Sequence, residues 1–100
     1  METQLQELKQ AAVSDFIKRW GHERAENFAD KFSFKMGKKY IKVIQDGSAW
    51  AFIVTKDGEG YRKGDILKAS SWSAPAKNSP RGNIIDGGYR VEWTGPLYLR

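Results

Sequence analysis

Asp46 and Gly47 stand between two runs of β-forming residues, and this arrangement constrains the fold more than any other feature of the chain. An Asp-Gly pair in this setting is a strong signal for a two-residue turn, because both central positions of the favoured turn need a left-handed backbone. The sequence therefore predicts an antiparallel hairpin made of residues 39–45 and 48–55.

A two-residue loop also predicts which side chains face each other. It pairs Val43 with Trp50 and Ile41 with Phe52 on one face, which we expect to be the core face. On the opposite face it pairs Tyr40 with Ile53, Lys42 with Ala51, and Ile44 with Ala49. This second face mixes apolar residues with a lysine, so it is either partly covered or a binding face.

An amphipathic helix is expected before the hairpin. Apolar residues recur at spacings of three and four through residues 3–20, which is the period of a helix with one buried side. Thr3 and Gln6 have the form of a capping box, and Gly21 is a suitable C-terminal stop. A second short helix is expected over residues 22–31, unless both segments form one kinked helix.

Strands are expected to fill the rest of the chain. They follow one another without intervening helices, so the sheet should be mostly antiparallel. We expect, in order, a strand at 61–70, a long loop at 73–83, a hairpin of 84–85 and 89–94 around a turn at 86–88, and a short edge strand at 97–99. The predicted fold is α+β, with a helix or helix pair in residues 1–31 packed on a sheet of about four to five strands in residues 32–100.

Length and composition narrow the class of protein. The chain has 100 residues, of which 40% are hydrophobic, so it can build one domain with one core, residues 1–100. It has no cysteine, which excludes disulfides and thiolate metal sites. The N-terminus lacks the order of a signal peptide, and no apolar run approaches the roughly 20 residues of a membrane helix. We therefore expect a cytoplasmic protein without membrane contact.

The charge is distributed unevenly along the chain. Residues 1–30 carry six acidic and four basic side chains, whereas residues 31–100 carry six acidic and thirteen basic ones. The net charge of +5 therefore comes from the second part of the chain. Such asymmetry favours a polyanionic partner, and the alternative is that the charge serves solubility alone.

Two segments carry candidate binding residues. Residues 31–42, KFSFKMGKKYIK, contain five lysines and no acid, and lysines can neutralise phosphates while exposed rings stack on unpaired bases. Residues 71–83 form a loop with further basic and amide side chains. The predicted nucleic-acid-binding residues are Lys35, Lys38, Lys39, Lys42, Trp72, Lys77, Asn78 and Arg81. The alternative is that Phe32, Phe34 and Trp72 belong to the core and the loop is structural.

Signals for catalysis are weak. His22 is the only histidine, and it stands in a charged helical segment. No acidic pair has a spacing that suggests acid–base work, and no glycine-rich phosphate loop precedes a helix. With one histidine and no cysteine, a transition-metal site would need an unusual set of carboxylates. We predict no catalytic residues, no metal and no cofactor.

The block KGDILKASSWSAPAKNSPRGNI, at residues 63–84, resembles one in a group of small uncharacterised proteins of tailed bacteriophages. GKKYIKVIQDGSAWAFIV before it and YRVEWTGPLYL after it fit the same pattern, so the resemblance covers residues 37–99. Residues 1–30 lie outside it. The resemblance implies a phage-encoded protein in the cytoplasm of an infected bacterium, and it implies no activity.

The leading hypothesis is a non-enzymatic accessory protein, monomer or homodimer, that binds nucleic acid, with single strands as one candidate form. The alternative is a protein-binding module that inhibits or redirects a host protein, because the chain has many aromatic residues and a helix that offers an interaction face. A minor virion component is a third hypothesis. Mimicry of DNA is disfavoured, since it needs dense negative charge and this chain is positive.

Overall fold

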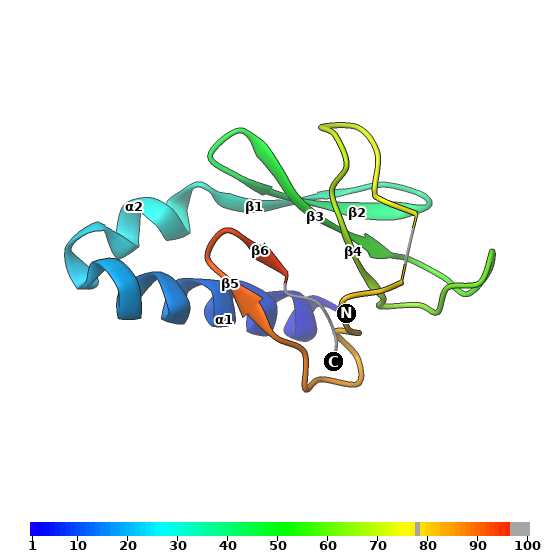
Figure 1. Cartoon of the computed structure of the whole chain (residues 1–100), viewed down its shortest axis with the longest axis horizontal. Coiled ribbons are helices and arrows are strands. Elements are labelled where there is room, and N and C mark those ends of the chain that lie inside the picture. The colour runs from blue at the N-terminus through cyan, green and yellow to red at the C-terminus, as the bar shows by residue number, and fades with distance from the viewer. Residues whose placement is uncertain (78, 97–100) are drawn as a thin grey trace.

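The computed structural model describes residues 1–77 and 79–96, and it confirms the α+β class (Figure 1). Within these residues, a helical part precedes a four-stranded antiparallel sheet and a separate two-stranded ribbon. The helices are α1 (Glu2–Trp20), the 3-10 turn η1 (His22–Arg24) and α2 (Ala25–Asp30). The strands are β1 (Phe32–Met36), β2 (Tyr40–Gln45), β3 (Ser48–Val54), β4 (Ile66–Lys68), β5 (Val91–Glu92) and β6 (Gly95–Pro96).

The predicted end of α1 is confirmed, and its predicted cap is wrong. Gly21 has a φ of 81° and donates its N–H to the carbonyl of Ile17 at 2.8 Å, which stops the helix. The helix begins one residue before Thr3, with Met1 in the cap position and no side-chain cap bond among the described residues. Thr3 therefore lies inside the first turn and cannot form a capping box.

The tight turn of the central hairpin forms where it was predicted. Asp46 and Gly47 have φ values of 50° and 78°, both in the left-handed region that this turn requires. Gln45 pairs with Ser48 directly beside the turn. The two-residue loop is therefore confirmed, and it starts the β2–β3 ladder in the expected register.

A β-bulge then shifts this register by one residue on β3. The observed pairs are Ile44 with Ala49, Val43 with Ala51, Lys42 with Phe52, Ile41 with Ile53 and Tyr40 with Val54. The predicted pairs of Val43 with Trp50, Ile41 with Phe52, Tyr40 with Ile53 and Lys42 with Ala51 are wrong. The extra residue lets Trp50 and Ala51 both pack in the core, and it turns Phe52 to the opposite face.

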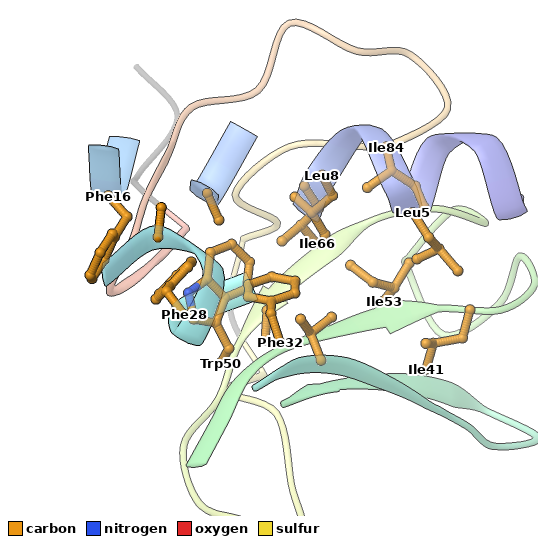
Figure 2. Packing of buried hydrophobic residues seen from close by; sticks show 14 residues of the cluster. Leu5, Leu8, Phe16, Phe28, Phe32, Ile41, Trp50, Ile53, Ile66 and Ile84 are labelled. Atoms are coloured by element: carbon orange, nitrogen blue, oxygen red, sulfur yellow. The ribbon is translucent and has the colours of Figure 1, made fainter. Parts of the chain in front are cut away.

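The main core lies between α1 and the inner face of the sheet (Figure 2). Leu5 and Leu8 of α1 are at most 1% exposed, and they pack in one cluster with Ile53 and Ile66 of the sheet. At the other end of this layer, aromatic rings fill the space between the helices and the sheet. These rings are Phe16, Phe28, Phe32, Phe34, Trp50 and Trp93. Phe32 is thus a core residue, and Phe34 is a partly buried residue that packs against the core.

The C-terminal part differs from the predicted hairpin. Residues 84–85 form no strand, because the side chain of Asn83 accepts the backbone N–H groups of Ile85 and Asp86 and holds them in a turn. β5 pairs instead with β6. The strand predicted at 61–70 is reduced to β4, and the edge strand predicted at 97–99 lies outside the described residues.

Candidate nucleic-acid interface

The face of the sheet that points away from α1 is called the outer face here. One row of it runs straight across all four strands: Lys35 on β1, Lys42 on β2, Phe52 on β3 and Leu67 on β4. Residues directly opposite each other on antiparallel strands point to the same side. Lys35 and Lys42 are therefore neighbours, with an apolar floor beside them.

The apolar part of the outer face is a second, smaller core. Phe52, Val54 and Leu67 are at most 5% exposed, and partly buried residues such as Tyr40 and Tyr61 pack around them. The ring of Tyr40 meets that of Phe52 edge-on, with centroids 5.9 Å apart. Residues 69–77, drawn in yellow in Figure 1, rise from β4 on the side away from the helices. This small core anchors the side chains above it.

Trp72 stands exposed on this loop beside the sheet. Half of its surface is accessible, so it does not plug the core. The Nζ atom of Lys42 lies 4.0 Å from the centre of its ring, a cation–π contact of about 0.5–1 kcal/mol at an exposed site. Lys42 thereby holds one aromatic ring in place on a surface that carries positive charge.

A polar cluster joins the loop to the start of β2. The Nζ atom of Lys77 donates a 2.7 Å hydrogen bond to the hydroxyl of Tyr40, and this bond raises the pKa of Lys77. The carboxylate of Glu59 lies 2.7 Å from Lys39 and 3.8 Å from Lys77. The hydrogen bond from Lys39 and its charge lower the pKa of Glu59 below its ordinary value. Glu59 and Lys77 are therefore both ionised at neutral pH.

Lys38 and Lys39 belong to the short connection between β1 and β2. The hydroxyl of Thr55 donates to the carbonyl oxygens of Lys38 and Lys39, at 2.6 and 2.9 Å, and fixes this turn. Gly37 permits it, because a Cβ atom there would lie 2.6 Å from the carbonyl oxygen of Tyr40. Both lysine side chains are exposed at one end of the outer face.

The structure thus brings six predicted residues to one side of the sheet: Lys35, Lys38, Lys39, Lys42, Trp72 and Lys77. Arg81 is not among them, since it is only 3% exposed and borders a hollow with Trp50 and Pro96. Its backbone N–H donates to the carbonyl of Ile66, so its segment pairs with β4. Asn78 lies outside the described residues.

Sequence reasoning missed three residues of this side, Lys56, Glu59 and Tyr61. All three belong to the segment from β3 to β4, which borders a cleft next to Tyr40. A usable signal was present, because Glu59 stands between two glycines in a turn. Glu59 has a φ of 53°, and a left-handed backbone is uncommon for a residue of this type. An unfavourable residue in such a position calls for another reason to be there.

The pieces KGD and RGN of the block at 63–84 have a structural role. Asp65 and Asn83 are both 6% exposed, and the Asn83 amide donates to the Asp65 carboxylate and to the carbonyl of Lys63, each at 2.9 Å. Gly64 and Gly82 are needed because a Cβ atom would lie 2.8 Å from the Asn83 side-chain oxygen and 2.5 Å from Tyr89, respectively. These hydrogen bonds therefore join residues 63–65 to residues 81–83 at the end of the sheet, and this link is called the staple below.

The residues that the structure describes contain no group of three or more His, Asp or Glu side chains that could hold a metal ion. His22 is exposed in η1. Within the same part of the chain, no helix has the length and apolar character needed to cross a bilayer.

Fold and surface together define a small α+β domain with a basic, aromatic outer sheet face. The chain belongs to a family described as "Family of unknown function (DUF7717)", whose model matches residues 1–99. The match includes the helical segment 1–30, so these helices are part of the family's domain. No curated protein and no solved structure matches the chain.

Proposed function

We propose that this protein is a non-enzymatic accessory module that binds single-stranded nucleic acid on the outer face of its sheet. One observation carries the proposal: Lys35 and Lys42 stand directly opposite each other, and Lys42 also holds the exposed ring of Trp72. Like charges in this position lower the stability of a sheet. A phosphate backbone lying over them would offset the repulsion, which gives the arrangement a purpose.

The balance of charge on this side supports an anionic ligand. Lys35, Lys38, Lys42 and Lys56 form no ion pair with any residue that the structure describes. Among the described lysines of this side, Lys39 and Lys77 are the two with an acidic partner, and they share the carboxylate of Glu59. Lysines without acidic partners can release condensed counterions from a phosphate backbone, which drives binding at low salt.

The aromatic residues favour a single strand over a duplex. A base can stack on the exposed ring of Trp72 only when it is unpaired. Reading a duplex usually places a helix or a β-ribbon in the major groove. Here α1 lies on the other side of the sheet, so none of the described helices accompanies the basic face (Figure 1).

The proposed setting is the cytoplasm of a bacterium infected by a tailed phage. The resemblance of residues 37–99 to small phage proteins supports this setting, and a single-strand binder fits it because phage replication exposes unpaired nucleic acid. The proposal does not depend on the setting, since the chemistry of the outer face would be the same elsewhere.

The test is a fluorescence anisotropy titration at about 50 mM salt, where electrostatic binding is strong. It compares labelled single-stranded DNA, single-stranded RNA and duplex DNA. We expect saturable binding of at least one single strand, with weaker binding of the duplex. If the protein binds none of the three nucleic acids, the proposal is wrong. If it binds single strand and duplex equally well, the preference for single strands is wrong.

Two triple variants show whether the outer face is responsible. The outer-face variant changes Lys35, Lys42 and Lys77 to Gln, and the matched control changes Lys18, Arg24 and Arg90 to Gln. Each removes three exposed or partly exposed cations, so the change in net charge is the same. We expect the outer-face variant to lose at least tenfold in affinity and the control to lose little. Equal losses would mean that only net charge matters.

A host-protein partner is a second candidate, and a different surface favours it. Trp20, at the end of α1, is 58% exposed and contacts the ring of Trp93 edge-on at 5.9 Å. Exposed tryptophans are common at the centres of protein interfaces. If a bacterial protein stays bound after nuclease treatment, and the variant Trp20→Ser no longer retains it, this second candidate is supported.

A further inference from the structure

A cleft of about 270 Å³ opens between the start of β2 and the turn that follows β3. Tyr40, Val54 and Tyr61 line it, and Lys38 and Lys56 also border it. Val54 is 5% exposed and both tyrosines are partly buried, so the walls are largely apolar. The cleft adjoins the outer face, because Tyr40 packs on Phe52 of that face.

The turn on one side of this cleft has a defined geometry. Gly58 and Tyr61 exchange backbone hydrogen bonds of 3.0 and 2.9 Å, with Glu59 and Gly60 between them at φ values of 53° and 86°. This is the conformation of a two-residue hairpin turn, in which Asn, Asp and Gly are the usual residues. Asp57 accepts the N–H of Lys63 at 2.7 Å and ties the turn to the following segment.

The ion pairs of Glu59 explain why glutamate, a residue less suited to this turn, stands there. Its carboxylate holds Lys39 and also approaches Lys77, which is hydrogen-bonded to the hydroxyl of Tyr40. The chain of contacts from Glu59 to Tyr40 connects the two sides of the cleft. The walls are therefore braced by side chains from three separate segments, and the space between them is preformed.

We propose that this cleft receives one unpaired nucleobase of the bound strand. This inference rests on the proposed binding of single-stranded nucleic acid and names a second contact point besides Trp72. Pockets for drug-sized ligands usually measure about 300–1,000 Å³. A cleft slightly below that range suits one planar ring system, and its tyrosine walls supply faces or edges against which such a ring packs.

The charges at the cleft favour a base with its phosphates over an uncharged ring or an apolar peptide side chain. Lys38 and Lys56 are both exposed and form no ion pair among the described residues. A base in the cleft would bring its two flanking phosphates within reach of these flexible side chains. Glu59 also borders the cleft, and its ion pair with Lys39 partly offsets its negative charge.

Photo-crosslinking tests the contact on the unaltered protein. A short oligothymidine strand carrying 5-iodouracil is bound, irradiated and digested, and the crosslinked peptides are identified by mass spectrometry. We expect crosslinks at Tyr40 or Tyr61 as well as at Trp72. Crosslinks at Trp72 without crosslinks at either tyrosine would overturn the proposed role of the cleft and leave the proposed function standing. A strand that fails to bind would sink both.

A strand without bases provides the second readout. The affinity of an oligothymidine is compared with that of an abasic strand of equal length, for the wild type, for Tyr61→Leu and for Trp20→Leu as a control on the helix side. One stacked base contributes about tenfold or more in affinity. Tyr61→Leu should lower the affinity for the oligothymidine about tenfold and leave the affinity for the abasic strand almost unchanged. Equal losses on both strands would contradict the proposal.

Discussion

At the scale of single residues, the exposed ring of Trp72 is the part of the outer face on which the proposed base stacking depends. Its ring is half exposed and its known contact is with Lys42, so removing the ring should cost the fold little. We expect Trp72→Ala to weaken binding of a single strand by about five- to a hundredfold, which corresponds to one stacked base. Trp72→Phe should retain most of the affinity. Anisotropy titration measures both variants.

The structural control for this prediction is thermal unfolding. Trp72→Ala should keep a melting temperature close to that of the wild type, because the core does not include this ring. Unchanged affinity in Trp72→Ala would show that the ring takes no part in binding. A large drop in melting temperature would show that the loop depends on it.

Removal of the Glu59 carboxylate is expected to raise the binding affinity, whereas removal of the Trp72 ring is expected to lower it. Its carboxylate competes with any anionic ligand for Lys39 and Lys77, and its left-handed backbone is better suited to asparagine. We expect Glu59→Asn to bind an abasic single strand several-fold more tightly at low salt, because such a strand uses the lysines and not the cleft, with the turn intact by circular dichroism. If binding weakened instead, Lys39 and Lys77 would not be contacting the ligand.

At the scale of elements, the staple between residues 63–65 and 81–83 should dominate local stability. Asn83 donates to Lys63 and Asp65 and accepts two backbone N–H groups, and Asp65 is a buried carboxylate. Asn83→Ala would leave these groups without partners, so we expect the free energy of unfolding to fall by about 2–4 kcal/mol. Urea titration followed by tryptophan fluorescence measures this.

Asn27→Ala on α2 is the control, since Asn27 is exposed. It should change the free energy of unfolding by at most about 0.5 kcal/mol. A similarly small effect of Asn83→Ala would mean that water replaces the lost partners and that the staple adds little.

Local patterns predicted those elements whose cause lies nearby in the chain. The apolar spacing through residues 3–20 and the left-handed turn at Asp46 and Gly47 are properties of a few neighbouring residues, and both are found. The bulge at Trp50 depends on how two side chains fill a core built by other segments. The alternation of residues within β3 does not indicate this bulge. The prediction that Phe52 lies on the core face was therefore wrong.

In the candidate site too, residues with a local cause were predicted and a residue placed by long-range contacts was not. Lys35, Lys42 and Trp72 are surface residues because β1, β2 and the 69–77 loop place them there, and their residue types already suggested a polyanion. Arg81 has the same chemistry, but the pairing of its segment with β4 turns it inward. Burial of a single arginine depends on long-range contacts, which composition does not record.

At the scale of the whole molecule, the helical segment and the rest of the chain differ in charge. The helical segment 1–30 carries a net −2 and the remainder +7, and the core separates the helices from the outer face (Figure 1). A polyanion approaching this domain is attracted to one side and repelled weakly by the other. On the proposed ligand, this charge distribution would orient the molecule before any ring contact forms.

The salt dependence of binding tests the central claim most directly. Each phosphate neutralised on a single strand contributes about 0.7 to the slope of log affinity against log salt. We predict that the outer-face variant, with Lys35, Lys42 and Lys77 changed to Gln, has a slope smaller by roughly two than that of the wild type. The matched control at Lys18, Arg24 and Arg90 should keep the wild-type slope. Identical slopes for both variants would contradict the account.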